Sequence, residues 1–189
     1  MMRIVSGKYG GIRLNPVKSD QTRPTTDKVK ESLFSMTGPY YHGGRFLDLF
    51  AGSGAVGIEA VSRGMDSAVL VDRQYQAVKA IKENIAKIHA EDQFTVIKGN
   101  AEMVLKQLAA NDVKFDQVFL DPPYKLQQIV KVLGDLLSLG LLNEGATVIC
   151  ETDNHTELPL DLDGFHAVKQ KNYGLTNLTI YNYQMENKQ

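Results

Sequence analysis

The feature that most constrains the fold is a regular alternation of short apolar runs and longer stretches of helical periodicity between residues 45 and 151. In residues 75–88, apolar side chains recur every three or four positions and lysines occupy the other face, as in an amphipathic helix. The runs that we expect to be strands are residues 45–50, 67–72, 94–98, 117–120 and 146–151. Strands that alternate with helices in this way predict a parallel sheet with helices on both faces.

The C-terminal region departs from this alternation. Residues 165–171 and 175–183 are strand-like runs joined by Asn172-Tyr173-Gly174, which is a hairpin signal. At least one C-terminal strand should therefore be antiparallel to the rest. We expect an α/β fold built on a Rossmann-like, doubly wound, mostly parallel sheet of seven strands with an antiparallel C-terminal strand.

The N-terminal region has a third pattern. Residues 1–24 are expected to form a small basic β-hairpin extension, with Gly10-Gly11 at or near its turn. A short helix over residues 27–36 should follow, capped by Thr25 or Thr26, because a threonine hydroxyl can accept a hydrogen bond from a free N–H of the first turn. Residues 25–189 then form the main domain.

Length and composition bound the class of protein. At 189 residues and 43% hydrophobic, the chain can form one sizeable α/β domain. No apolar stretch approaches the roughly 20 residues of a membrane span, and the N-terminus lacks the apolar core of a signal peptide. The single cysteine, Cys150, lies inside an expected strand and is interpreted as a core residue. Without a metal-ligand cluster in the sequence, we expect a cytoplasmic protein that needs no metal.

A glycine loop follows the first expected strand. Residues 52–57 match G-x-G-x-x-G, and Asp72 follows about 20 residues after the first glycine, where a ribose-binding carboxylate should lie. Glycines let a ligand approach the backbone, and the next helix offers free N–H groups. Two cofactors fit this loop, a dinucleotide or S-adenosylmethionine, and a purely structural turn is the third interpretation. Asp48 at the loop entrance favours the second, because its charge suits a cationic methionine end and opposes a pyrophosphate.

Asn100-Ala101 follow the third expected strand. At the carboxyl end of that strand, Asn100 and Ala101 could hydrogen-bond to the edge of an adenine ring. Asparagine is also a good helix cap, and Asn100 is well placed to cap the helix that should run to about residue 109. Both interpretations of Asn100 stay open from the sequence.

A second motif, Asp121-Pro122-Pro123-Tyr124, ends the fourth expected strand. The Asp121 carboxylate and the Pro122 carbonyl can accept both N–H bonds of an exocyclic amine, which aims the nitrogen lone pair at a methyl donor. Positioning then supplies much of the catalysis. Tyr124 can stack on the base, a contact worth about 1–3 kcal/mol. A rigid strand-exit turn is the alternative interpretation of the two prolines.

Charge is distributed unevenly along the chain. The net charge is −1, but residues 1–30 hold seven basic and two acidic side chains, so this segment carries +5 and the other 159 residues carry −6. A basic arm on an acidic body is typical of a polyanion-binding surface. We expect Arg3, Lys8, Arg13 and Arg23 to contact phosphates. A charged extension that is merely solvated is the alternative.

Several segments carry a resemblance to a known family: Arg3-Ile4-Val5-Ser6-Gly7, Gly10-Gly11, Arg23-Pro24-Thr25, residues 29–34, residues 47–54, residues 57–64 and the Asp-Pro-Pro-Tyr motif. Together they resemble the bacterial 16S rRNA (guanine-N2)-methyltransferases of the small-subunit rRNA methyltransferase D type, which are class I S-adenosylmethionine-dependent enzymes. The resemblance runs from residue 3 to about residue 183. Asp72 departs from it, since related sequences often have glutamate there, although either carboxylate can bind ribose.

The resemblance implies methylation of a guanine in 16S rRNA, within the 30S subunit or an assembly intermediate, by a monomer that also contacts ribosomal proteins. The base must then leave its helix or loop to reach Tyr124. The implied cofactor contacts are Asp48, Ala51, Gly52, Gly54, Asp72, Asn100, Ala101 and Asp121. The implied target-base contacts are Asp121, Pro122 and Tyr124, with the N-terminal hairpin and Arg23 near the RNA.

Three other functions remain open from the residues alone. A DNA adenine or cytosine amino-methyltransferase uses the same motifs, but usually carries a larger recognition insertion than 189 residues allow. A protein glutamine methyltransferase favours Asn-Pro-Pro-Tyr, which Asp121 opposes. An RNA-binding module that has lost catalysis would bind no cofactor. The motif at residues 121–124 would also hold an adenine N6 amine about as well as a guanine N2 amine.

Overall fold

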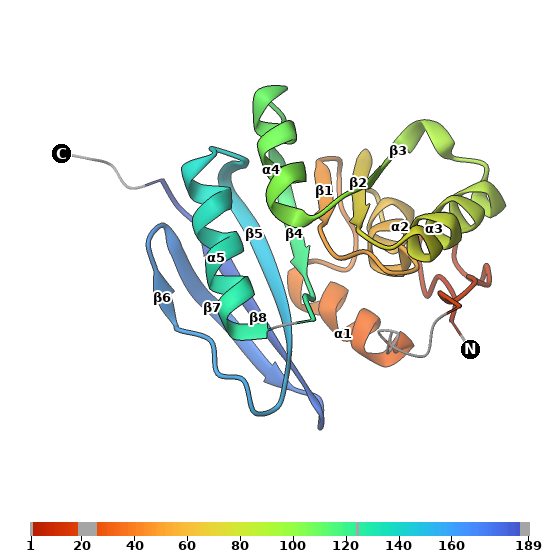
Figure 1. The fold of residues 1–189 in the computed structure, drawn as a ribbon. Coiled ribbons are helices and arrows are strands. Elements are labelled where there is room, and N and C mark those ends of the chain that lie inside the picture. The colour runs from red at the N-terminus through yellow and green to blue at the C-terminus, as the bar shows by residue number, and fades with distance from the viewer. Residues whose placement is uncertain (1, 19–25, 124, 186–189) are drawn as a thin grey trace.

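The structure is a computed structural model that describes residues 2–18, 26–123 and 125–185. These residues contain one sheet of eight strands in the order β3-β2-β1-β4-β5-β8-β7-β6 (Figure 1). The strands are β1 (Arg45–Asp48), β2 (Ser67–Asp72), β3 (Phe94–Lys98), β4 (Phe115–Leu120), β5 (Leu142–Asp153), β6 (Asp161–Leu162), β7 (Phe165–Asn172) and β8 (Thr176–Tyr183). The strands β3, β2, β1, β4 and β5 pair in parallel. The predicted Rossmann-like, mostly parallel sheet is therefore confirmed.

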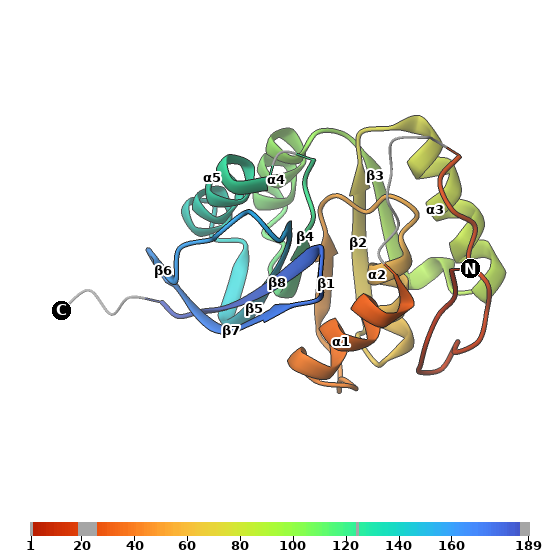
Figure 2. The same ribbon diagram turned by 90° about the horizontal axis from the view of Figure 1, so that it is seen from below.

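Helices cover both faces of the sheet (Figure 2). They are α1 (Asp27–Thr37), α2 (Ala55–Ser62), α3 (Tyr75–Ile88), the 3-10 turn η1 (Glu91–Gln93), α4 (Ala101–Ala110) and α5 (Lys125–Ser138). Successive strand residues point to opposite faces. In β1, Phe46 packs in the core beneath α1, α2 and α3, whereas Leu47 packs in the core beneath α4 and α5. β1 is thus buried on both sides, whereas β3 at the edge of the sheet is only partly buried.

The C-terminal strands are antiparallel, as predicted. β8 pairs antiparallel with β5, and β7 pairs antiparallel with β8. The sheet has one strand more than the expected seven, because β6 pairs with β7 at the edge. β6 has only two residues, Asp161 and Leu162, and so short a strand leaves no alternating pattern in the sequence.

The N-terminal segment folds back on itself and packs against the main domain. The Ile4 N–H donates to the Ile12 carbonyl at 2.9 Å, and an isolated antiparallel bridge joins Arg3 and Arg13. Ile4 and Leu14 are buried in the core beneath α1, α2 and α3. The expected extension is therefore a short irregular hairpin anchored in that core. The expected boundary at residue 24 lies outside the described residues, so the division into two domains stays a prediction.

A buried polar cluster holds this hairpin to α1 and α2. The Glu59 carboxylate accepts hydrogen bonds from the N–H groups of Val5 and Ser6, at 2.8 and 3.0 Å. It also pairs with Lys30 Nζ at 3.3 Å and with Arg63 Nε at 3.0 Å. Both Lys30 and Glu59 are fully buried. Buried charges are tolerated only when they are paired and hydrogen-bonded. The Glu59 carboxylate has partners from the hairpin, from α1 and from the end of α2.

Candidate active site

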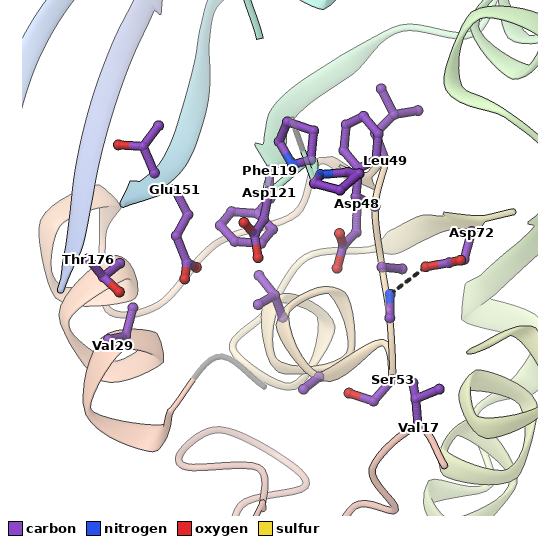
Figure 3. Close-up of a pocket in the computed structure, with 18 of the residues that line it drawn as sticks. Val17, Val29, Asp48, Leu49, Ser53, Asp72, Phe119, Asp121, Glu151 and Thr176 are labelled. Carbon is purple, nitrogen blue, oxygen red and sulfur yellow. Dashed lines mark hydrogen bonds between the residues drawn. The ribbon is translucent and has the colours of Figure 1, made fainter. Parts of the chain in front are cut away.

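A cavity of about 770 Å³ lies at the carboxyl ends of β1, β2, β4 and β5. Its rim includes Met2 and Val17 of the N-terminal segment, Val29 of α1 and Thr176 at the start of β8 (Figure 3). Open α/β sheets bind ligands at this edge, and the volume is that of a small-molecule site. The cavity therefore has the place and size of a cofactor and substrate site.

Besides Asp153 at the end of β5, four carboxylates reach this cavity from four adjacent strands: Asp72, Asp48, Asp121 and Glu151. Their common orientation follows from the register, in which Asp48 pairs with Leu70 on one side and Phe119 on the other. Residues two apart on a strand point to the same face. Each carboxylate thus continues a row whose apolar members, Phe46, Leu70, Phe119 and Ile149, pack beneath α1, α2 and α3. The sheet presents a line of hydrogen-bond acceptors to the ligand.

Asp48 is the most deeply buried of the four, with 1% of its surface exposed. Its Oδ2 accepts a hydrogen bond from the Gly57 N–H at 3.3 Å, while its Oδ1 has no partner among the described residues. Burial raises the pKa of Asp48 to about 8, and the charges of Asp121 and Asp72 act in the same direction, while the Gly57 N–H opposes them. A buried carboxylate with an unsatisfied oxygen suits a cationic hydrogen-bond donor.

Asp72 ties the glycine loop to the end of β2. Its Oδ2 accepts from the Gly52 N–H and its Oδ1 from the Gln74 N–H, each at 2.9 Å. Gly52 and Gly54 have positive φ angles of 55° and 80°. A side chain at Gly57 would lie 2.1 Å from the Leu70 side chain, so glycine is what lets α2 pack onto β2. These contacts hold the glycine loop against the ends of β2 and α2.

Asn100 serves as the N-cap of α4, as one of its two interpretations predicted. Its Oδ1 accepts from the Met103 N–H at 2.9 Å, and Asn100 and Ala101 also line the cavity. Thr26, one of the two caps predicted for α1, accepts from the Val29 N–H at 3.3 Å. Capping uses only the oxygen of Asn100, so its amide N–H groups are not engaged by the cap.

The predicted site residues are largely brought together. Asp48, Ala51, Gly52, Asp72, Asn100, Ala101, Asp121 and Pro122 all line the cavity. Gly54 does not line it; this glycine is the N-cap of α2 in a left-handed conformation. Tyr124 and Arg23 lie outside the described residues. The roles assigned to all these residues remain predictions.

The predicted phosphate-contacting residues lie outside the cavity. The side chains of Arg3, Lys8 and Arg13 are exposed on the N-terminal hairpin. Arg3 Nε pairs with the Asp27 carboxylate at 3.3 Å, and Lys8 Nζ lies 5.1 Å from the centre of the Tyr9 ring. The two legs of the hairpin reach the cavity at Met2 and Val17. An RNA contact by this hairpin would therefore be made beside the cavity and not within it.

Several cavity residues were not anticipated from the sequence. Glu151 ends the fifth expected strand, so its position at the carboxyl edge of the sheet could have been predicted from the sequence. Val29 and Thr176 come from elements far away in the sequence, and no local pattern relates them to the site. Cys150 is buried on the other face of the sheet, where burial raises its pKa. It is a core residue, as predicted.

The described residues contain neither a metal site nor a membrane-spanning helix. No group of three or more His, Cys, Asp or Glu side chains in these ranges is arranged to hold a metal ion. Among the helices of the same ranges, none is both long and apolar enough to span a bilayer.

The doubly wound sheet and its acidic, glycine-looped cavity are those of a Rossmann-like protein that binds a ligand at the carboxyl edge of the sheet, and comparison with known proteins identifies this one as a methyltransferase. It belongs to the family described as Conserved hypothetical protein 95, whose model matches residues 2–182, and its relatives include proteins named Ribosomal RNA small subunit methyltransferase D. The family resemblance predicted from the sequence is thereby confirmed.

Individual relatives cover nearly the whole chain. "Putative rRNA methyltransferase YlbH" of Bacillus subtilis is 42% identical over 180 residues, which are 95% of this chain and 98% of that protein. Ribosomal RNA small subunit methyltransferase D of Haemophilus influenzae is 32% identical over 95% of this chain and 93% of its own length. The solved structure "Putative methyltransferase yhhF from Escherichia coli" superposes with a TM-score of 0.85 at 29% identity, covering 97% of this chain and 98% of that one.

Proposed function

We propose that this protein transfers the methyl group of S-adenosylmethionine to the exocyclic N2 amine of a guanine in 16S rRNA of the small ribosomal subunit. The observation that carries the proposal is that one cavity is lined by both the glycine loop and the Asp121-Pro122 turn. A donor site and an acceptor for an amine are thus within reach of each other. The named relatives support rRNA as the substrate class.

The cofactor half of the cavity fits S-adenosylmethionine by its chemistry. The unsatisfied Oδ1 of Asp48 would accept from the ammonium of the methionine portion, and Asp72 would accept from the ribose hydroxyls. The backbone of Ala51 and Gly52 would contact the ligand, Gly54 would shape the end of the loop where α2 begins, and Asn100 with Ala101 would contact the adenine. When bound, the cofactor supplies a methyl group made electrophilic by its sulfonium.

The Asp-Pro-Pro-Tyr motif would hold the target amine. The Asp121 carboxylate and the Pro122 carbonyl accept its two N–H bonds and leave the nitrogen lone pair directed at the methyl group. The bound cofactor would supply the methyl group, whose bond to sulfur would break as its bond to the nitrogen forms, and Asp121 or water would take the proton that the alkylated nitrogen loses. Tyr124 would stack on the extruded base. The chain supplies orientation and proton acceptance, the two things that a weakly nucleophilic amine requires.

The N-terminal hairpin, residues 1–24, would act as an RNA-contacting extension of the domain formed by residues 25–189. Arg3, Lys8, Arg13 and Arg23 are the proposed phosphate contacts. The partner would be 16S rRNA in the 30S subunit or an assembly intermediate, with ribosomal proteins adding affinity that a net charge of −1 does not supply. The protein would act in the cytoplasm as a monomer.

Labelled methyl transfer tests this proposal directly. Purified protein is offered 30S subunits from an unmethylated strain, naked 16S rRNA and duplex DNA, and the products are digested for nucleoside mass spectrometry. The proposal predicts N2-methylguanosine in the 30S sample. N6-methyladenosine, or label in the DNA sample, would replace the proposed substrate, and absence of transfer to all three would overturn the proposed reaction.

A further inference from the structure

The cavity continues beyond the residues that the cofactor would occupy. Figure 3 shows Asp48, Asp72 and Ser53 on one side of Asp121, and Glu151, Thr176 and Val29 on the other. All of these residues line the same cavity. Asp121 thus stands between a half that fits the cofactor and a second half to which no role has been assigned.

Glu151 is the strand neighbour of Asp121. β4 and β5 are parallel, with Leu120 paired to Cys150, so the residues that follow, Asp121 and Glu151, stand next to each other across the two strands. Neighbouring strands are about 4.8 Å apart, and paired residues of parallel strands point to the same face. The two carboxylates therefore present acceptors side by side to one flat ligand.

The walls of this second half suit a ring seated edge-on to the carboxylates. Val29 of α1 offers an apolar side chain, and Thr176 enters from β8, where it pairs with Asp153. Leu178 of β8 pairs with Glu151, so β8 covers the side of β5 that faces away from β4. A base in this half would meet apolar surface on its face and carboxylate oxygens on its edge.

The arrangement separates guanine from the other amino-bearing bases. Guanine carries an N1–H beside its N2 amine, so its Watson–Crick edge offers donors at two adjacent positions. Adenine carries an N1 lone pair beside its N6 amine, and cytosine an N3 lone pair beside its N4 amine. An ionised carboxylate only accepts hydrogen bonds. Beside the amine that Asp121 would hold, a second carboxylate therefore attracts guanine and repels the lone pairs of adenine and cytosine.

We propose that Glu151 is the residue that selects guanine, by accepting the N1–H of the target base while Asp121 holds its N2 amine. This inference rests on the proposed function and adds to it the element that the Asp-Pro-Pro-Tyr motif lacks. Specificity commonly comes from repulsion of the wrong partner as well as from attraction of the right one. One base contact of this kind discriminates by about tenfold or more.

The test is Glu151→Gln, which keeps the shape of the side chain but lets its amide donate to the N1 lone pair of adenine. Methyl transfer is measured on 30S subunits reconstituted with 16S rRNA carrying the natural guanine or adenine at the methylated position. We expect kcat/KM on guanine to fall about tenfold or more, mainly through KM, and the adenine-to-guanine ratio to rise by a similar factor. Glu157→Gln, an exposed carboxylate outside the cavity, is the matched control.

Binding of S-adenosylhomocysteine and the unfolding temperature are followed for each variant, since a misfolded site would change both. An adenine-to-guanine ratio that stays within twofold of wild type, with cofactor binding intact, overturns the role of Glu151. Failure of the wild-type protein to methylate the natural guanine overturns the proposed function instead. The measurement on the wild-type protein alone gives this result.

Discussion

Asp48 accepts a hydrogen bond from the Gly57 N–H at 3.3 Å through one carboxylate oxygen, while its other oxygen is buried without a partner among the described residues. β1 thus delivers a carboxyl group to the bottom of the cavity where α2 begins. Because burial raises its pKa to about 8, this group carries a proton at neutral pH in the empty protein. A cationic ligand would favour its ionised form.

The first prediction is that cofactor binding releases a proton. Between about pH 6 and pH 8 the empty site holds Asp48 protonated, and the ammonium of a bound methionine portion should lower its pKa, so affinity should rise with pH and level off above pH 8. Titration calorimetry with S-adenosylhomocysteine at pH 7, in two buffers of different ionisation enthalpy, measures this proton. Asp48→Asn should abolish the difference between buffers and weaken binding. Equal enthalpies for the wild-type protein in both buffers would contradict the assignment.

The second prediction concerns the buried pair of Lys30 and Glu59. Lys30→Met removes one of the two cations that pair with the fully buried Glu59 carboxylate and leaves only Arg63, and breaking such a buried pair costs up to about 3–5 kcal/mol. Urea unfolding should show the loss, and limited proteolysis should cut the N-terminal hairpin sooner, because Lys30 Nζ also donates to the Arg3 carbonyl.

An exposed pair in α4 provides the comparison. Lys106 and Glu102 lie 2.9 Å apart with more than half of each side chain exposed. Lys106→Met should cost less than about 1 kcal/mol. The double variant Lys30→Met/Glu59→Gln should not recover the lost stability, since Arg63, which is also buried, then loses its carboxylate partner. Equal losses at Lys30 and Lys106 would show that the buried cluster does not hold the hairpin.

Local patterns predicted the scaffold, and tertiary contacts decided the remainder. The positions of Asp48, Asp72 and Asp121 near the carboxyl ends of strands could be predicted from the sequence, because parallel strands deliver these ends to one edge, although β1 ends at Asp48 and not at the expected residue 50. The roles of Lys30 and Glu59 could not be predicted, because the two residues are 29 positions apart. In the sequence each of them looks like an ordinary charged residue on the exposed face of a helix. Val29 reaches the cavity because α1 packs on one face of the sheet, and Thr176 reaches it because β8 pairs with β5. Asp121 and Glu151 become neighbours through the β4–β5 register, which periodicity does not specify.

The third prediction is that the N-terminal hairpin supplies phosphate contacts. Replacing Arg3, Lys8 and Arg13 together with glutamine should raise the KM for 30S subunits. It should also reduce the slope of log affinity against log salt by about two, since each phosphate contact contributes roughly 0.7–0.9. The matched control neutralises Lys106, Lys114 and Lys131, which are exposed elsewhere on the surface. If the slope of log affinity against log salt falls by the same amount in both triple variants, the hairpin is only solvated surface.

The last prediction separates positioning of the target from binding of the donor. Asp121→Asn should lower kcat at least about a hundredfold, because the amide offers one acceptor fewer and cannot take the proton of the alkylated amine. Affinity for S-adenosylhomocysteine should stay within a few fold, since Asp48 and Asp72 would still hold the cofactor. Asp112→Asn is the matched control: it removes an exposed carboxylate in the turn before β4, at a φ of 53° that asparagine tolerates well. Transfer rates and titration calorimetry are measured on the same preparations. Near-normal turnover by Asp121→Asn, or loss of cofactor binding in step with activity, would remove Asp121 from the role of holding the amine.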